Sequence, residues 1–328
     1  MADLELITAR GWQVLRLTTD QIAVDIVPGL GGTIVSLRRR SDDLELLWRS
    51  PWGLRPPGSP AVPGTSDALM MDTFVGGWQT LFPNGGDSAT TSGVEWGQDG
   101  EARIAPFEWE RTGDTLTMTT RLVRSPFEIT KIVSVEAARV RVEESIRNVG
   151  GETLETMWGQ QVIFGPPLLS PDTVVDAAAA LVHPDPITAS GAGYHDITPW
   201  PRTPGPYSMI NLRTLPAADA YELRQAYLTE FRRPWASVSN ARLDLAVDLE
   251  WNSQTWPYLW YALEAGRQEG FPWFSRGYFF SLTPSTSWPA HGLHDARSVS
   301  STTLWVAPDL EVTSQLTLTL RPAGGTRG

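Results

Sequence analysis

The chain has 328 residues, of which 41% are hydrophobic and 19% charged, and its formal net charge is −11. The hydrophobic content is enough for a sizeable core, and the low charged fraction argues against a disordered chain. The negative charge disfavours nucleic acids and anionic membrane surfaces as partners because both are polyanions. Cysteine is absent, which excludes disulfides, thiolate metal sites and cysteine nucleophiles.

The first part of the chain alternates apolar and polar residues, the pattern of β-strands with one buried face. Such segments span residues 12–17, 21–27, 33–37 and 44–48, and the first two predict a hairpin. Residues 50–73 are rich in Pro, Gly and Ser and predict a long loop. Four further segments follow within residues 107–148 with only short turns between them, which predicts an antiparallel meander.

The second part of the chain resumes the strand pattern after a proline-rich stretch. Residues 183–207 predict a structured loop between sheets or a lid, and residues 216–228 are the only segment that suits a short helix. Strands are expected again over residues 278–282, 302–306 and 314–320. Strands and helices do not alternate, so we expect an all-β fold, a large antiparallel β-sandwich that forms one domain over residues 1–328.

The chain contains 15 tryptophans, an enrichment of several-fold. About half of them are expected to pack in the core and between sheets. The others suit a ligand that is apolar on one face and hydroxylated at its rim, because tryptophan combines an aromatic face with an N–H donor. A small-molecule sugar is such a ligand, and we expect one as the partner.

Several segments resemble, in order, the aldose 1-epimerase (galactose mutarotase)-like family. They are residues 28–37 with 46–48, residues 76–86, residues 157–165, and residues 256–261, 271–274 and 282–286. Together they extend over most of the chain, from about residue 22 to 320. The resemblance implies a galactose mutarotase-type β-sandwich and a sugar ligand.

The sequence departs from the family at the positions usually credited with chemistry. The family carries histidines where Asp99 and Gln161 stand here, and a glutamate base where Thr283 precedes Pro284. Mutarotation removes a proton from the anomeric hydroxyl while the ring oxygen gains one, and a carboxylate with a histidine supplies that pair. Glutamine cannot deliver a proton near neutral pH, and threonine needs a partner to act as a base. The chemistry must therefore use other groups.

Asp99, Glu101 and Glu264 are the candidate catalytic residues. A spacing of two residues on a strand puts Asp99 and Glu101 on one face, where paired carboxylates can act as acid and base. Glu264 follows an aromatic strand and can point into a cleft. The alternatives are that Asp99 caps a loop or accepts from a sugar hydroxyl, that Glu101 is a structural hydrogen-bonding group, and that Glu264 is a solvated strand end.

Six further residues are candidates for stacking on a sugar or bonding its hydroxyls: Trp78, Asn84, Gln161, Trp260, Arg276 and Thr283. The alternative roles are loop packing for Trp78, turn formation for Asn84 and a surface ion pair for Arg276. His291 and His294 come shortly after the last of the six, and one of them can reach the cleft. No third ligand accompanies them, so we expect neither a metal nor a cofactor.

Three functions remain open from the sequence. The first is an aldose 1-epimerase-like isomerase that uses acid–base chemistry at the anomeric centre. The second is a sugar lyase or glycoside-cleaving enzyme on the same scaffold, and the third is a non-catalytic sugar-binding protein. We expect a monomer or homodimer without nucleic acid or membrane partners, and a cytoplasmic location because the N-terminus lacks the pattern of a signal peptide.

Overall fold

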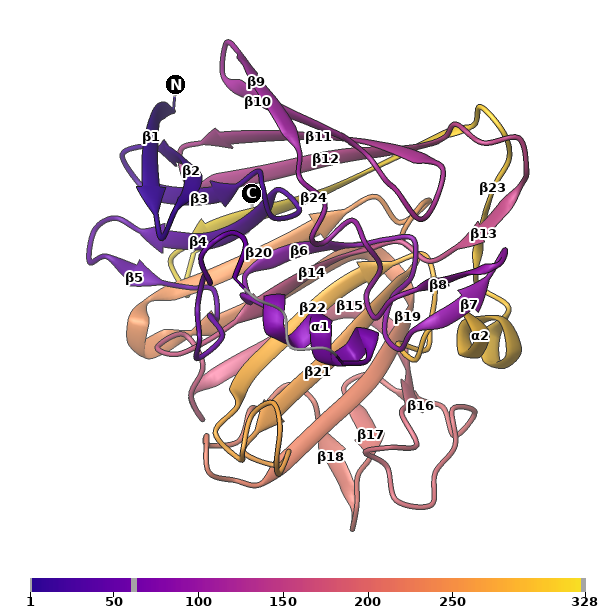
Figure 1. Cartoon of the computed structure of the whole chain (residues 1–328). Coiled ribbons are helices and arrows are strands. Elements are labelled where there is room, and N and C mark those ends of the chain that lie inside the picture. The colour runs from indigo at the N-terminus through magenta and orange to yellow at the C-terminus, as the bar shows by residue number, and fades with distance from the viewer. Residues whose placement is uncertain (1, 60–63, 326–328) are drawn as a thin grey trace.

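The computed structural model describes residues 2–59 and 64–325, with 50% of the chain in strands and 6% in helices. Every pairing between the named strands of the main sheet is antiparallel, and the pairings join two runs of strands (Figure 1). The first run, in order of pairing, is β9 (Glu108–Thr112), β10 (Thr115–Arg121), β11 (Phe127–Glu136), β12 (Arg139–Asn148), β24 (Glu311–Arg321) and β20 (Leu245–Trp251).

The second run carries the candidate site. In order of pairing it is β1 (Asp3–Ala9), β2 (Trp12–Thr18), β3 (Ile22–Val27), β4 (Thr33–Arg39), β6 (Trp78–Leu81), β14 (Gly159–Phe164), β22 (Tyr278–Ser285) and β21 (Tyr258–Ala265). The short β5 (Leu44–Glu45) pairs with β4.

One long strand, β19 (Glu222–Asn240), connects the two runs. Its first part pairs with β21 and its last part with β20, so the same strand belongs to both layers. Beside it runs β15 (Thr173–Pro184), which pairs along most of its length with a register shift between Ala177 and Ala179. The shift lets the ladder bend from one layer to the other, as bulges do. The short strand β16 (Thr198–Pro199) pairs with the end of β15.

The main hydrophobic core lies between the two runs. Leu15 and Val24 from the second run and Val133 and Leu316 from the first belong to the same buried cluster. Strand β11 alternates strictly between buried and less buried residues, as a strand with one covered face should. Strand β22, in contrast, is buried at almost every position. Its outer face must therefore be covered as well, and the candidate site lies under that cover.

Smaller elements complete the structure. The two-stranded pairs are β7 (Ala89–Thr91) with β8 (Val94–Trp96), β13 (Leu154–Thr156) with β23 (Leu304–Val306), and β17 (Arg202–Pro204) with β18 (Met209–Asn211). The helices are α1 (Ser66–Thr73), the short α2 (Leu293–Asp295), a 3-10 turn over Ala241–Leu243 and a π turn over Ala296–Ser300. Helix α1 lies in front of β14, β22 and β21 in Figure 1. None of the helices in the described part of the chain is long and apolar enough to cross a membrane.

The predicted antiparallel β-sandwich is confirmed, including the first hairpin and the four-stranded meander. Two local predictions are wrong. Residues 222–228 form the start of β19 and not a helix, because β15 and β21 supply hydrogen-bond partners on both sides and override the helix-forming composition of the segment. The predicted loop over residues 50–73 contains helix α1, which begins where Thr65 Oγ1 accepts a hydrogen bond of 3.3 Å from the N–H of Ala68.

Candidate active site

A cavity of about 540 Å³ opens on the face of β14, β21 and β22 that is turned away from the core. Alternation along β21 puts Trp260, Ala262 and Glu264 on this face. On β22, Thr283 lies opposite Trp260, and Phe279 lies opposite Glu264. These two rows are four residues apart, or about 13 Å at ~3.3 Å per residue. The cavity is therefore elongated, with a Thr283 end and a Glu264 end.

The Glu264 end holds a buried carboxyl group among aromatic rings. The Glu264 residue is only 1% exposed, and its Oε1 accepts a hydrogen bond of 2.9 Å from the N–H of Gln268. Its Oε2 has no hydrogen-bond partner among the described residues. Burial raises the pKa of Glu264, and the backbone N–H groups of Gln268 and Arg267 with the Arg267 charge offset part of that rise. Trp273 and Phe279 also line the cavity and are packed edge to face, 5.4 Å between ring centres.

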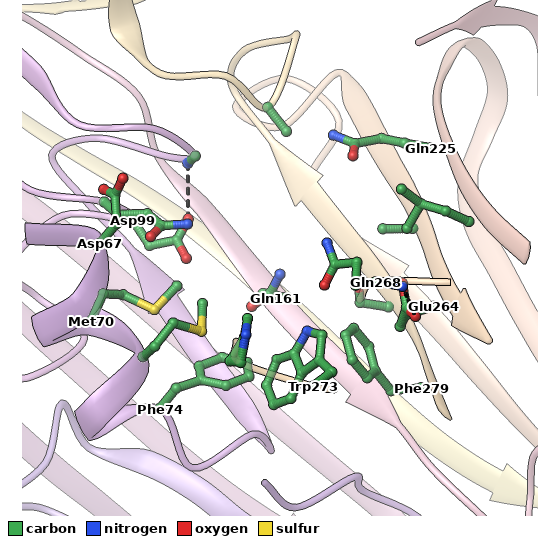
Figure 2. A pocket seen from close by; sticks show the side chains of 18 of the residues that line it. Asp67, Met70, Phe74, Asp99, Gln161, Gln225, Glu264, Gln268, Trp273 and Phe279 are labelled. Carbon is green, nitrogen blue, oxygen red and sulfur yellow. Dashed lines mark hydrogen bonds between the residues drawn. The ribbon is translucent and has the colours of Figure 1, made fainter. Parts of the chain in front are cut away.

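The Thr283 end holds a second buried carboxyl group, that of Asp99. Its Oδ1 accepts a hydrogen bond of 2.8 Å from the N–H of Gly86, and the preceding Gly85 packs closely on Trp260. Burial raises the pKa of Asp99, while the Arg103 guanidinium and the Gly86 N–H partly offset the rise. Figure 2 shows Asp99 and Asp67 on one side of the cavity, Glu264 and Gln268 on the other, and Gln161 between them.

Gln161 and Thr283 bring hydrogen-bonding groups to the same cavity but no titratable group. Gln161 comes from β14, and its buried Oε1 has no partner among the described residues. Thr283 is 1% exposed and lines the cavity beside it. Both amide and hydroxyl can hydrogen-bond a ligand, but neither exchanges a proton readily near neutral pH. The structure thus places these two residues where the sequence analysis expected ligand contacts.

Helix α1 covers the outer side of the cavity. Met70 and Phe74 line it from this helix region and pack against Trp273 in one hydrophobic cluster with Trp48. Trp273 also stacks on Trp52, with 5.5 Å between ring centres and 2° between planes. These contacts fix the aromatic wall seen beneath Gln161 in Figure 2. Aromatic side chains are typical of the walls of small-molecule sites.

Some lining residues were missed by the sequence analysis. Gln225 lines the cavity from β19, a segment predicted to be helical, so its orientation could not be inferred. Gln268 comes from a loop. Asp67 comes from α1, which lies within the loop predicted over residues 50–73. Trp273 lies in a segment that resembles the family, and Phe279 lies shortly before another. That resemblance was the one signal in the sequence that could have identified them as lining residues.

The prediction that Glu101 shares a face with Asp99 is wrong. The two residues lie in a turn, in which Asp99 has φ of 58° and not the extended value of a strand. Glu101 faces the loop at Ser125, whose N–H and hydroxyl both donate to Oε1 at 2.9 Å, and the N–H groups of Val123 and Arg124 also donate to its carboxylate. It does not line the 540 Å³ cavity but a neighbouring hollow of about 720 Å³. Glu101 is thus a structural hydrogen-bond acceptor.

Three of the predicted substrate-binding residues do not line the cavity. Trp78 lies in the core, where its Nε1 donates to Gln160 Oε1 at 2.7 Å. The buried Asn84 side chain joins two loops by donating to the carbonyl of Asp87 and accepting from the N–H of Leu293. Arg276 is exposed to solvent outside the cavity. The structure thus places these three side chains away from the cavity, because neighbouring segments of the fold, which the local sequence does not show, determine where each side chain lies.

The tryptophans serve the core more than the cavity. Of the 15, only Trp260 and Trp273 line the 540 Å³ cavity. Trp260 is held by a hydrogen bond of 2.6 Å from its Nε1 to the carbonyl of Ser287. Trp158 and Trp256, in contrast, are completely buried between the layers and pack edge to face. The tryptophan-lined cleft predicted from composition is therefore a cavity with two tryptophans.

His291 does not reach the cavity but forms a buried ion pair behind it. Its Nε2 lies 2.7 Å from Asp185 Oδ2, and its Nδ1 lies 3.8 Å from Asp87 Oδ2. Burial alone lowers the pKa of His291, but the hydrogen bonds to and charges of these two aspartates raise it to about 10. The hydroxyl of Tyr227 also donates to Asp185. Within the described residues no group of three or more potential ligands could hold a metal ion.

Comparisons with known proteins identify the fold. No family model matches the sequence, and no curated protein matches it significantly. Among solved structures, the Slr1438 protein from Synechocystis sp. PCC 6803 is 16% identical, with a TM-score of 0.69 over 96% of this chain and 99% of that one. A galactose mutarotase related enzyme from Lactobacillus acidophilus is 16% identical, with a TM-score of 0.65 over 94% and 98%. A candidate aldose 1-epimerase from Escherichia coli K12 is 16% identical, with a TM-score of 0.65 over 95% and 100%.

The chain therefore has the fold of the galactose mutarotase-like proteins. The similarity covers nearly the whole of each chain, although the identity of 11–16% among the matched structures is low. The sequence resemblance to aldose 1-epimerases is thus confirmed at the level of the fold.

Proposed function

We propose that this protein binds a sugar in the 540 Å³ cavity and interconverts its anomers, with Asp99 as the catalytic residue. The observation that carries the proposal is the Asp99 carboxyl group, a buried acid with a raised pKa beside Gln161 and Trp260. The volume suits a small ligand, and aromatic walls with few polar groups are typical of such sites. We also propose the cytoplasm as its location.

A single protonated carboxyl group is sufficient for this reaction. One of its oxygens takes the proton of the anomeric hydroxyl while the other gives its own proton to the ring oxygen, and the bond between the anomeric carbon and the ring oxygen breaks. The carboxyl group ends with one proton, as it began, and the open aldehyde recloses on either face by the reverse step. Burial favours the protonated form that this exchange needs. No histidine is then required at Gln161 and no glutamate at Thr283.

Glu264 is assigned a binding role because of its distance along the sheet. Its row lies four residues, or about 13 Å, from the row of Thr283. The anomeric and ring oxygens are bonded to one carbon, so Asp99 and Glu264 do not act together on them.

The proposal is tested by magnetisation-exchange NMR of aldoses and their derivatives in the presence of the protein. We expect anomeric exchange above the buffer rate for at least one sugar, with Asp99→Asn reducing it by about 10²–10⁴-fold. Glu101→Gln, in the neighbouring hollow, is the matched control and should exchange at the rate of the unmodified protein. Exchange at the buffer rate for every sugar would reject the proposal. Release of a second product in mass spectra would favour a lyase or a glycoside-cleaving enzyme instead.

A non-catalytic sugar-binding protein is the second candidate. The observation that favours it is that Gln161 and Thr283 cannot titrate near neutral pH, so two of the three usual catalytic positions carry only hydrogen-bonding groups. This candidate predicts saturable binding by calorimetry without anomeric exchange. Asp99→Asn would then change the dissociation constant while leaving no turnover to lose.

A further inference from the structure

Among the described residues, the titratable side chains that line the cavity are all acidic. Asp67, Asp99 and Glu264 contribute carboxyl groups, and no lysine, arginine or histidine lines the cavity within the described part of the chain. The cations that act on these carboxyl groups are not part of the lining: Arg103 acts on Asp99, and Arg267 acts on Glu264. A phosphate or carboxylate group on the ligand would therefore enter without a cation to receive it.

The orientation of Gln225 adds an acceptor to this wall. The hydroxyl of Tyr227 has one hydrogen, which it donates to Asp185, so it can only accept from its other neighbours. It accepts from Gln225 Nε2 at 3.0 Å and from the N–H of Ala290 at 3.1 Å. The Gln225 amide is thus fixed with Nε2 toward Tyr227, which leaves Oε1 as the atom available to a ligand.

The Glu264 end combines an unpartnered acceptor with aromatic faces. The Glu264 residue is only 1% exposed, and its Oε2 has no hydrogen-bond partner among the described residues. Trp273 and Phe279 line the same end, as Figure 2 shows. An ammonium group is attracted both to a carboxylate and to aromatic faces. Such a group would also shift Glu264 toward its ionised form, because a nearby positive charge favours it.

The cavity is long enough that a single sugar ring held at Asp99 does not extend to the Glu264 end. The rows of Thr283 and Glu264 are about 13 Å apart, which is longer than one pyranose ring. A ligand that occupies both ends therefore has at least two units.

We propose that the ligand is a sugar of at least two units with its reducing end at Asp99 and a free ammonium group on the second unit, bound between Glu264, Trp273 and Phe279. This inference rests on the proposed sugar-binding function and names its substrate class. It excludes uronic acids and sugar phosphates as preferred ligands, because the described lining of the cavity offers their negative groups acidic side chains and no cation.

Isothermal titration calorimetry with five probes tests this inference. The probes are the β-1,4-linked dimer of D-glucosamine, its N-acetylated form, cellobiose, cellobiouronic acid and monomeric D-glucosamine. We expect the free-amine dimer to bind at least ten-fold more tightly than each of the others, and the acid to bind most weakly. The N-acetylated dimer is the control for size without charge. Equal affinity of the amine and N-acetyl dimers, or of the dimer and the monomer, would overturn the inference, as would absence of binding by all five probes.

Glu264→Gln locates the contribution of the charge. In this variant the affinity of the free-amine dimer should fall to that of the N-acetylated dimer, while the affinity of cellobiose should change less than three-fold. An unchanged preference for the amine would overturn the assignment to Glu264. Anomeric exchange separates the two proposals: exchange of neutral sugars without a preference for amines rejects only the substrate class, whereas tight amine binding without exchange rejects only the isomerase.

Discussion

Asp99 and Gly86 exchange two hydrogen bonds. The N–H of Gly86 donates to Asp99 Oδ1 at 2.8 Å, and the N–H of Asp99 donates to the carbonyl of Gly86 at 2.9 Å. Gly86 has φ of 80°, and a Cβ added there would lie 2.0 Å from the carbonyl oxygen of Ala290. Only glycine fits this position without moving the Ala290 loop. The pair therefore fixes a carboxyl group at the cavity through its backbone and its side chain together.

Asp99→Asn should abolish most anomeric exchange while keeping the loop in place, because an asparagine Oδ1 can still accept from Gly86. The expected loss is about 10²–10⁴-fold in the exchange rate. In the unmodified protein the rate should fall as the pH rises through the raised pKa of Asp99, since the protonated form is the active one. Exchange rates measured by NMR across pH 4–9 check both expectations. A rate that rises with pH over this range would contradict the assigned role.

The stability of Glu264→Gln should differ from that of the unmodified protein mainly above the ordinary glutamate pKa of 4.5. A carboxyl group whose pKa is raised in the folded state binds protons more readily there than in the unfolded chain. The stability of the unmodified protein therefore falls as the pH rises from 4.5 through the raised pKa. The charged group that acts on Glu264 is Arg267. Urea unfolding at several pH values should show a flatter profile for Glu264→Gln, and parallel profiles would argue against the raised pKa.

Trp260→Phe and Trp78→Phe should separate ligand binding from packing. Each change removes an indole that donates one hydrogen bond, to Ser287 in the first case and to Gln160 in the second. Only Trp260 lines the cavity. Both variants should lose about 1–3 kcal/mol of stability, but only Trp260→Phe should weaken sugar binding, by roughly ten-fold or more. Calorimetry with the sugar and thermal unfolding of both variants measure the two effects, and equal weakening of binding would contradict the assignment.

The strand pattern and the family segments were enough to predict the fold, because strands such as β11 bury one face and so alternate visibly in the local sequence. The meander from β9 to β12 needs no information from elsewhere in the chain. The first part of β19 was mispredicted because its conformation depends on distant partners, β15 and β21.

The site was predicted less completely than the fold. Gln161, Trp260 and Thr283 lie at the cavity where the family segments indicated. Trp78 and Asn84 come from a similar segment but point into the core and into a loop junction. Neighbouring residues of one segment point in different directions, and only the strand pairings determine which of them face the cavity. A sequence resemblance therefore locates a segment more reliably than it assigns a side chain.

Asp185 and His291 form the ion pair that supports the wall of the cavity from behind. Asp185 is completely buried, and it also accepts from the hydroxyl of Tyr227, which orients Gln225. Removing one partner of such a pair leaves an uncompensated buried charge, so Asp185→Asn and His291→Gln should each cost about 3–5 kcal/mol. The double variant should cost less than their sum, by about 0.5–3 kcal/mol.

The pH dependence of this pair has a definite sign. The pKa of His291 is raised from 6.5 to about 10, so its contribution to stability is fully present below pH 6.5 and is lost as the pH rises through about 10. The titratable groups that face it are Asp185 and Asp87. Urea unfolding between pH 6 and 10 should therefore show a loss of stability in the unmodified protein that is missing from His291→Gln. Matching losses in both proteins, or strictly additive single variants, would show that the two residues are not coupled.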